Sequence, residues 1–341
     1  MTPAALEPWL QELLGLDTPP SDAEPLVVEG RSYVLRDGIL RLVAEGVSSS
    51  QDQTSEAFGF KWQQSDSFES EAVMDVTREH ARDRYGDVVN EPWWGEYGER
   101  PVVVDAGCGA GVTALAMLGP ILDRIHYIGV DLSSSVDVAA ARFARRGVAG
   151  TFIQADMNAI PLPEGSVHFA LAEGTLHHTD DTETAFRNVA RLIAPGGRFA
   201  FYVYRHKAPI REFTDDYIRD RLQEMTPQEG WDAMLPLTKL GEALAELDVT
   251  VDVPEDVDLL GIPAGRHDVQ RLIYWYVAKL YHRPEWSLEE NNHVNYDWYA
   301  PRNAYRHSED EVRAWCETAG LDIERECIQE AGITVVARRP D

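Results

Sequence analysis

Hydrophobic positions between residues 101 and 204 follow two different periods in turn. Short apolar runs typical of buried strands occur at residues 102–105, 126–131, 150–156, 168–173 and 198–204. Helical patterns fill the gaps, and the sequence Pro-Gly-Gly at 195–197 ends the last of them. Strands that alternate with helices form a parallel sheet covered on both faces. We therefore predict an α/β core for residues 101–206.

The first hundred residues predict an N-terminal extension. Leu6, Trp9, Leu10, Leu13 and Leu14 recur at helical spacing, with no basic flank that would indicate a signal peptide. Two short strands are predicted around an Asp-Gly turn at 37–38, followed by a polar loop at 48–58 and a helix at 71–86. We treat residues 1–100 as one extension with a lid function.

The strand and helix alternation stops after residue 206 and resumes near residue 307. Residues 207–306 are helical, aromatic and acidic, which predicts a helical substrate cap inserted over the carboxyl edge of the sheet, where open α/β sheets bind ligands. Residues 307–341 predict a helix, capped by Ser308 with Glu311, and a final pair of strands at 322–328 and 332–338 that completes the sheet.

The charge balance narrows the range of partners. The chain has 58 acidic residues against 31 basic ones, a formal net charge of −27, and no long basic run. Such a chain repels phosphate backbones and anionic membrane surfaces, so we expect neither nucleic acid nor membrane as a partner. Three cysteines without a Cys-x-x-Cys spacing argue against a disulfide framework or a structural zinc site. We expect a cytoplasmic protein without a metal, and leave a homodimer open.

A glycine-rich turn follows the first predicted strand of the core. Gly107, Gly109 and Gly111 let the backbone turn sharply and approach a ligand without a Cβ clash. Dinucleotide enzymes use a Gly-x-Gly-x-x-Gly turn at this place, whereas here the spacing is Gly-x-Gly-x-Gly after Asp105. A carboxylate beside the turn disfavours a pyrophosphate and suits a cationic or amine-bearing ligand.

Acidic residues also end the next two strands. Asp131 is placed to accept hydrogen bonds from both hydroxyls of a ribose. Asp156 is placed to accept one from an adenine amino group, while Met157 packs on the ring. Either residue alone could be a helix cap, but acids ending three successive strands put three acceptors at one edge.

Four segments together resemble the class I S-adenosylmethionine-dependent methyltransferases: VVVDAGCGAG, GVDLS, QADMNAIPLPEGSVHFALAEGTLHH and LIAPGGRFAF. The resemblance implies a Rossmann-like, doubly wound sheet of seven strands, six parallel and one antiparallel, with S-adenosylmethionine as cofactor. It places Asp105 and Gly107 near the methionine moiety, Asp131 and its neighbour Leu132 at the ribose, and Asp156 with Met157 at the adenine. Glu173 matches a position that faces the cofactor and the active site.

The region before the core resembles the leader of small bacterial methyltransferases that begin with a zinc-ribbon-like module. No cysteine precedes Cys108, so a ribbon here would lack its metal and be held by packing alone. The resemblance makes Phe58, Phe60 and Trp62 candidates for a lid over the cofactor, with core packing as the alternative.

His177 and His178 follow the fourth strand, where a general base is expected. A histidine suits that role because its ordinary pKa of about 6.5 lies close to neutral pH. The alternative is that one ring only packs beneath the cofactor. A metal site at this His-His-Thr-Asp-Asp run is less favoured than a helix cap formed by residues 179–183.

We expect the methyl acceptor to be bound by polar and aromatic residues at the end of the insertion. That segment is too polar for a core and leads back to the sheet edge. The candidate residues are Tyr296, Asp297, Tyr299, Arg302 and His307, together with Arg205 after the fifth strand.

The predicted function is transfer of a methyl group from S-adenosylmethionine to an oxygen, nitrogen or sulfur atom of a small molecule. Two alternatives remain open. One is an NAD(P)-dependent oxidoreductase, which would share the sheet and the ribose carboxylate. The other is an S-adenosylmethionine-binding regulatory protein that has lost turnover.

Overall fold

A computed structural model describes residues 6–18, 25–28, 30–43, 48–63 and 70–341. The strands are β1 (Leu26–Val28), β2 (Arg31–Arg36), β3 (Ile39–Leu42), β4 (Val102–Ala106), β5 (His126–Asp131), β6 (Thr151–Gln154), β7 (Val167–Glu173), β8 (Ile193–Tyr204), β9 (Thr250–Val253), β10 (Gly265–Asp268), β11 (Asp322–Ile328) and β12 (Gly332–Arg338). The helices are α1 (Pro8–Leu13), α2 (Ser49–Gln63), α3 (Glu71–Tyr85), α4 (Val112–Leu118), α5 (Ser135–Arg145), α6 (Thr182–Ala190), α7 (Pro209–Leu222), α8 (Pro227–Ala245), α9 (Val269–Tyr276), α10 (Leu288–Tyr299) and α11 (Glu309–Thr318). Shorter helical turns are η1 (Val88–Asn90), η2 (Pro92–Glu96), η3 (Gly119–Ile121), η4 (Met157–Ala159), η5 (Leu176–His178) and η6 (Asp258–Leu260).

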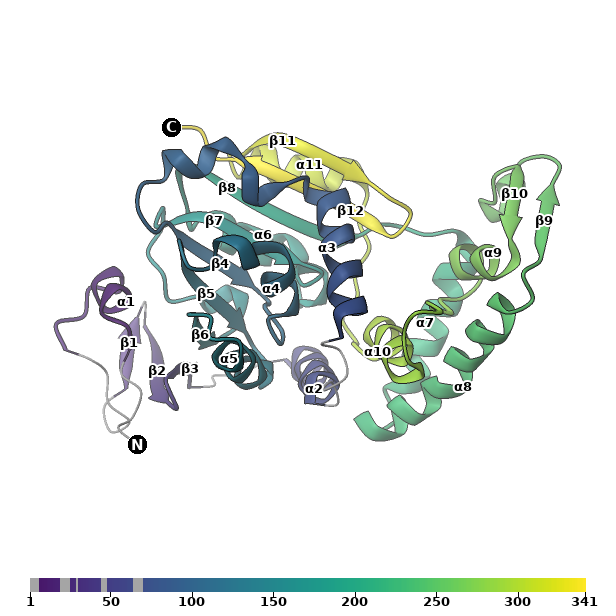
Figure 1. Ribbon diagram of the computed structural model, residues 1–341, viewed down its shortest axis with the longest axis horizontal. Coiled ribbons are helices and arrows are strands. Elements are labelled where there is room, and N and C mark those ends of the chain that lie inside the picture. Colours follow the sequence, from purple (N-terminus) through teal and green to yellow (C-terminus); the bar gives the residue numbers. More distant parts are fainter. Residues whose placement is uncertain (1–5, 19–24, 29, 44–47, 64–69) are drawn as a thin grey trace.

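One large sheet organises the described chain, in the order β1-β2-β3-β6-β5-β4-β7-β8-β12-β11 (Figure 1). The pairs from β3 across to β8 are parallel, and β12 is antiparallel to both β8 and β11. The stretch from β6 to β11 therefore has the predicted seven strands, of which only β12 runs opposite to the others. The α/β class and the antiparallel final hairpin are confirmed.

The predicted strand count is wrong at the other edge of the sheet. Strands β1, β2 and β3 extend the sheet beyond β6, so the described sheet has ten strands. The hairpin from β2 to β3 turns at Asp37 and Gly38, both with positive φ, as a two-residue turn of the I′ type requires. Leu40 of β3 then pairs in parallel with Ile153 of β6. A hairpin with one parallel outer partner was not anticipated, because only the tertiary structure brings β3 and β6 together.

Two hydrophobic cores cover the two faces of the sheet. One face packs against α3, α4 and α5, with Val112 and Phe143 among the buried residues. The other face packs against α1, α6 and α11, with Leu10, Phe186 and Trp315 buried. This double covering explains the nearly continuous apolar runs of the central strands.

Two local predictions from the sequence differ from the structure. The segment expected to be a polar loop at residues 48–58 forms most of helix α2. The Pro-Gly-Gly sequence at 195–197 lies within β8, which begins at Ile193. The insertion is helical as expected, but it also contains the small hairpin of β9 and β10 at its far end (Figure 1).

The fold predicts that the N-terminal strands stabilise the core. Leu40 is fully buried among the side chains on the α6 face, so Leu40→Ala should lower the free energy of unfolding by about 2–5 kcal/mol in urea denaturation. Val27→Ala on β1 is the control, because the Val27 side chain is 63% exposed and its truncation should change stability by less than about 0.5 kcal/mol. Equal effects of the two substitutions would contradict the packing described here.

Candidate functional site

A cavity of about 370 Å³ lies where the carboxyl ends of the parallel strands meet the insertion. The sheet contributes residues at or just after the ends of β4, β5, β6, β7 and β8, among them Gly107, Asp131, Asp156, Glu173 and Tyr204. The remaining walls come from α2, α3, α7, α9 and α10 and the segment between α9 and α10. The cavity therefore joins the N-terminal extension, the sheet edge and the insertion.

The glycine turn after β4 requires its glycines. Gly107 has a φ of 83°, and a Cβ there would lie 2.4 Å from the Thr175 side chain and 2.8 Å from the Met157 methyl. A Cβ on Gly109 would lie 2.8 Å from the Trp62 indole nitrogen. Gly111 also has a positive φ but faces Phe143 on α5, and it begins α4 without lining the cavity. Two of the three predicted glycines thus shape the cavity and the third shapes the helix start.

Asp131 links this turn to the end of β5. One carboxylate oxygen accepts a hydrogen bond from the Gly109 backbone N–H at 2.9 Å, and the other accepts from the Ser133 backbone N–H and hydroxyl. Burial raises the pKa of Asp131, while these donors oppose that shift. Asp131 and the adjacent Leu132 both line the cavity.

We call the glycine turn after β4, together with Asp131 and Asp156, the cradle. Asp105 lies beneath this cradle and is not part of the cavity wall. Its carboxylate is buried and accepts a hydrogen bond from the Tyr127 hydroxyl at 2.9 Å. Burial raises the pKa of Asp105 to about 7. The structure therefore gives Asp105 no exposed contact surface in the cavity.

Asp156 and Met157 line the cavity next to the glycine turn. Asp156 caps the short helix η4 by accepting the Asn158 backbone N–H at 2.7 Å. Glu173 also lines the cavity, and its two carboxylate oxygens accept hydrogen bonds from Arg84 and the Tyr85 hydroxyl of α3. Sequence analysis did not single out these two α3 residues, because nothing in the pattern of α3 relates them to β7.

The two predicted histidines have different surroundings. His177 is fully buried, packs against the tilted ring of Tyr204 with ring centroids 3.6 Å apart, and does not line the cavity. His178 lines the cavity, and its Nδ1 lies 2.5 Å from the Asn303 carbonyl oxygen. Since a carbonyl oxygen only accepts, Nδ1 carries the proton and Nε2 holds the free lone pair. Burial lowers the pKa of His178 to about 4, so the ring is neutral at physiological pH.

Helix α2 closes the cavity on one side. Gln51, Thr54, Phe58, Lys61 and Trp62 lie on one helical face, and all of them line the cavity. Of the three lid candidates, Phe58 and Trp62 are on this face. Phe60 points elsewhere, toward Trp231 and Tyr296. A helical pattern at residues 51–62 could have identified this face, but the many polar residues there suggested a loop.

Of the six candidate acceptor residues, only Asp297 lines the cavity, and its carboxylate forms an ion pair with Lys61 of α2. Although burial raises the pKa of Asp297, the Lys61 ammonium lowers it to about 2. The helix α10 that carries Asp297 is thus tied to α2 across the cavity.

The other five candidates lie outside the cavity wall. Tyr296 packs on Phe60 and Trp231, and the Tyr299 hydroxyl accepts the Lys279 backbone N–H at 2.8 Å. Arg302 is exposed, Arg205 pairs with Glu309, and His307 packs on Trp315. Tyr296 and Tyr299 are buried on α10 faces that the aromatic composition alone did not distinguish.

Several cavity residues were not among the site residues predicted from the sequence, although the aromatic ones of the insertion belong to the predicted substrate cap. They are mostly basic or aromatic and come from distant elements: His80, Arg84, Tyr202, Tyr204, Lys207, Arg211, Tyr274, Lys279, Tyr281, Trp286 and His293. Tyr202 and Tyr204 could have been predicted to lie together, because residues two apart on β8 share a face.

The described residues contain no group of three or more His, Cys, Asp or Glu side chains arranged to hold a metal ion. Nor does any helix of the described part have the length and apolar character needed to cross a membrane.

The cavity chemistry fits S-adenosylmethionine. The glycine turn leaves space that a Cβ would fill, and Asp131 and Asp156 place acceptors beside it for hydroxyl and amino groups. Met157 and Leu132 offer apolar surface between those acceptors. The carboxylates of Asp131 and Asp156 beside the glycine turn suit a ligand that carries hydroxyl and amino groups.

Comparisons with known proteins agree with this chemistry. A family model described as a methyltransferase domain matches residues 104–201. An uncharacterized methyltransferase, YcgJ of Bacillus subtilis (strain 168), is 30% identical over 174 residues, which cover 48% of this chain and 67% of that protein. The O-methyltransferase rstn1 of Aspergillus nomiae is 31% identical over 101 residues, which cover 29% of this chain and 44% of that protein.

Solved structures show a more distant likeness. The magnesium protoporphyrin IX methyltransferase of Synechocystis PCC 6803 with bound S-adenosylhomocysteine is 15% identical, with a TM-score of 0.45, and the match covers 85% of this chain and 97% of that one. The 1,6-didemethyltoxoflavin-N1-methyltransferase of Burkholderia thailandensis is 15% identical, with a TM-score of 0.44, and the match covers 93% and 100%. Both TM-scores are too low to add to the family assignment.

The assignment therefore rests on the matched domain and on the Bacillus relative, of which this chain covers two thirds. The matched domain includes the glycine turn together with Asp131, Asp156 and Glu173, which form the cofactor side of the cavity. The chain belongs to the class I S-adenosylmethionine-dependent methyltransferases, and its cofactor is S-adenosylmethionine.

Proposed function

We propose that the chain transfers the methyl group of S-adenosylmethionine to an oxygen, nitrogen or sulfur atom of a small molecule. The observation that carries this proposal is one cavity lined both by the cofactor cradle and by the insertion. Its volume of about 370 Å³ lies within the range of small-molecule sites. The insertion and α2 cover the sheet edge, so a small acceptor is favoured over a polymer.

The residues of the chain have two tasks in this reaction. When bound, S-adenosylmethionine supplies a methyl group on a positively charged sulfur, and that group is open to in-line attack. Gly107, Asp131 and Asp156 hold the cofactor, while aromatic rings from the insertion exclude water and orient the acceptor. Holding two reactants in an aligned geometry can contribute about 7–11 kcal/mol to the lowering of the barrier.

His178 is the general base that we favour for a hydroxyl or ammonium acceptor. The Asn303 carbonyl fixes the proton on Nδ1, so Nε2 accepts the proton from the acceptor. The negative charge of Asp297 raises the pKa of His178 and so stabilises the ring once it is protonated. His177 has no such access, and we assign it a packing role beneath Tyr204. The name of the Aspergillus relative is consistent with an oxygen acceptor.

Cofactor binding tests the cradle. Asp131→Asn removes the charge from an acceptor of three hydrogen bonds, so the Kd for S-adenosylhomocysteine in calorimetry should rise by roughly 10- to 100-fold. Asp137→Asn is the control, because Asp137 is half-exposed on α5 and pairs with Arg41. NAD and NADP should not bind. Binding of either nicotinamide, or an unchanged Kd in Asp131→Asn, would contradict the cradle assignment.

Turnover tests the acceptor class and the base. We expect wild-type protein to move labelled methyl from S-adenosylmethionine onto a small molecule in an acceptor screen. His178→Gln should then lower kcat by about 10²- to 10⁴-fold while the Kd for S-adenosylhomocysteine stays unchanged. His206→Gln, with a side chain 58% exposed, is the control and should retain full activity.

The pH profile gives a second measure of the base. A histidine with a pKa of about 4 is already in its neutral, proton-accepting form across pH 6–8, so His178 should produce no fall in kcat/KM near pH 6.5. The fall in rate that is lost in His178→Gln should appear only as pH drops toward 4, where the ring becomes protonated. Tight cofactor binding without transfer to any small molecule would favour the regulatory alternative.

A further inference from the structure

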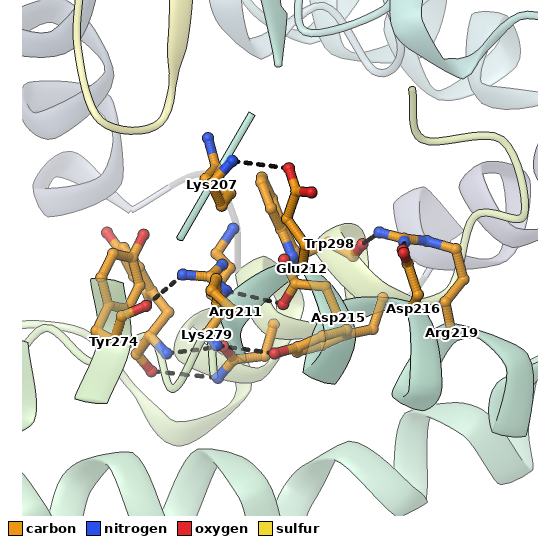
Figure 2. Close-up of polar contacts among 12 residues, drawn as sticks. Lys207, Arg211, Glu212, Asp215, Asp216, Arg219, Tyr274, Lys279 and Trp298 are labelled. Atoms are coloured by element: carbon orange, nitrogen blue, oxygen red, sulfur yellow. Dashed lines mark hydrogen bonds and ion pairs between the residues drawn. The ribbon is translucent and has the colours of Figure 1, made fainter. Parts of the chain in front are cut away.

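The insertion side of the cavity concentrates positive charge in a strongly acidic protein. Lys207, Arg211 and Lys279 all line it and surround the ring of Trp298, with their charged groups 5.6, 5.1 and 4.4 Å from the ring centroid (Figure 2). We call these three residues and Trp298 the cationic wall. The whole chain carries a formal charge of −27, so this local balance is opposite to that of the molecule.

The positive charge of Arg211 is balanced within the protein by the carboxylate of Asp215. Its Nε donates to Asp215 Oδ1 at 2.8 Å, and both side chains are almost completely buried. A second guanidinium nitrogen donates to the Tyr274 backbone carbonyl. A buried pair with these hydrogen bonds is a fixed part of the wall and leaves little charge for a ligand.

The ammonium groups of Lys207 and Lys279 are not paired with a carboxylate in this way. The Lys207 ammonium donates to the backbone carbonyls of Glu330 and Ala331, and the Lys279 side chain is held over Trp298. Over the described ranges, no carboxylate lies within 4 Å of either ammonium. The nearby Asp297 raises the pKa of Lys279, but its own ion pair is with Lys61.

Lys279 is buried and Lys207 is half-buried, and this loss of solvent disfavours the charged form of each. Burial lowers the pKa of Lys279 to about 7 and that of Lys207 well below its usual value. The groups that act on Lys279 are Asp297 and Asp215, which favour its charge, and Arg211 and Lys61, which oppose it. Two lysines without ion-pair partners in one wall form a site that a negatively charged ligand would complete.

The other cavity residues indicate what kind of molecule would carry the negatively charged group. Tyr274, Tyr281 and Trp286 line the cavity near the wall, and Tyr204 lies between His178 and Trp298 with ring centroids 5.4 and 4.3 Å away. One small molecule can therefore contact both the proposed base and the lysines. The flat rings of Tyr274, Tyr281 and Trp286 suit an aromatic ring as the body of the ligand.

We propose that the methyl acceptor is an aromatic molecule bearing an anionic oxygen group, which binds between Lys207 and Lys279. This inference rests on the proposed function and specifies its substrate class. Because the Tyr299 hydroxyl accepts the Lys279 backbone N–H, Tyr299 is a positioning residue for this subsite.

Calorimetry on full-length protein saturated with S-adenosylhomocysteine tests the proposal with three probes. They are 4-hydroxybenzoate, its neutral amide 4-hydroxybenzamide, and phenyl phosphate. The benzoate should bind at least about tenfold more tightly than the amide, as a charge-assisted contact predicts. Comparison of benzoate with phenyl phosphate distinguishes a carboxylate subsite from a phosphate subsite.

Substitutions then test whether Lys279 is the residue that causes the preference for the benzoate. Lys279→Met keeps a side chain of similar length without charge, and should abolish the preference for the benzoate over the amide. Lys239→Met on the exposed surface of α8 is the control and should keep it. Lys279→Met should not lower the melting temperature, because it removes a buried charge that has no ion-pair partner.

Proton uptake provides an independent readout. An anion beside Lys279 raises its pKa from about 7, so binding at pH 8 should take up protons, and the observed heat should depend on the ionisation enthalpy of the buffer. The uptake should be smaller in Lys279→Met, where only Lys207 remains to be protonated beside the anion.

The outcomes separate the two proposals. If S-adenosylhomocysteine itself does not bind, the proposed function fails first. If it binds but the amide equals the benzoate, or no anionic probe binds at millimolar concentration, only the anionic subsite is overturned. An unchanged preference in Lys279→Met would also overturn it.

Discussion

Parallel strand pairing is the constraint on which the site depends. Strands β6, β5, β4, β7 and β8 all run the same way, so their carboxyl ends reach one edge of the sheet. The glycine turn, Asp131, Asp156 and Glu173 lie at or just after these ends and become neighbours for that reason. The contact of Gly109 with Asp131 then locks the ends of β4 and β5 together and shapes the cofactor cradle.

The acceptor side of the cavity has a different origin. It is assembled from helices that are far apart in the chain and meet only over the sheet edge. The ion pair of Lys61 with Asp297 joins α2 to α10, and Arg84 with Tyr85 joins α3 to Glu173 at the end of β7. These buried polar contacts pair basic groups with carboxylates, so they join the walls of the cavity with their charges largely balanced. Lys207 and Lys279 have no such carboxylate partner over the described ranges, which is why we propose an anionic acceptor beside them.

The cofactor side was predictable because each of its residues has a local signal. Positive φ at Gly107 follows from a strand that turns into a helix, and Asp131 and Asp156 follow from their places at strand ends. Asp105 shows the limit of that reasoning. Its position was predicted correctly as a strand end, but the Tyr127 hydroxyl from the neighbouring strand determines where its carboxylate lies.

The sequence by itself determined the sheet, its helical cover and the cradle, because periodicity and turn chemistry act over a few residues. Only the tertiary structure decided which residues complete the site. Helix α2 could be recognised as a wall only once its polar face met a cavity, and Tyr299 and Lys279 became partners only through the packing of α10. Likewise, β3 joins the sheet through its pairing with β6, more than a hundred residues away. Contacts of this kind depend on how distant segments pack, and no local pattern in the chain encodes them.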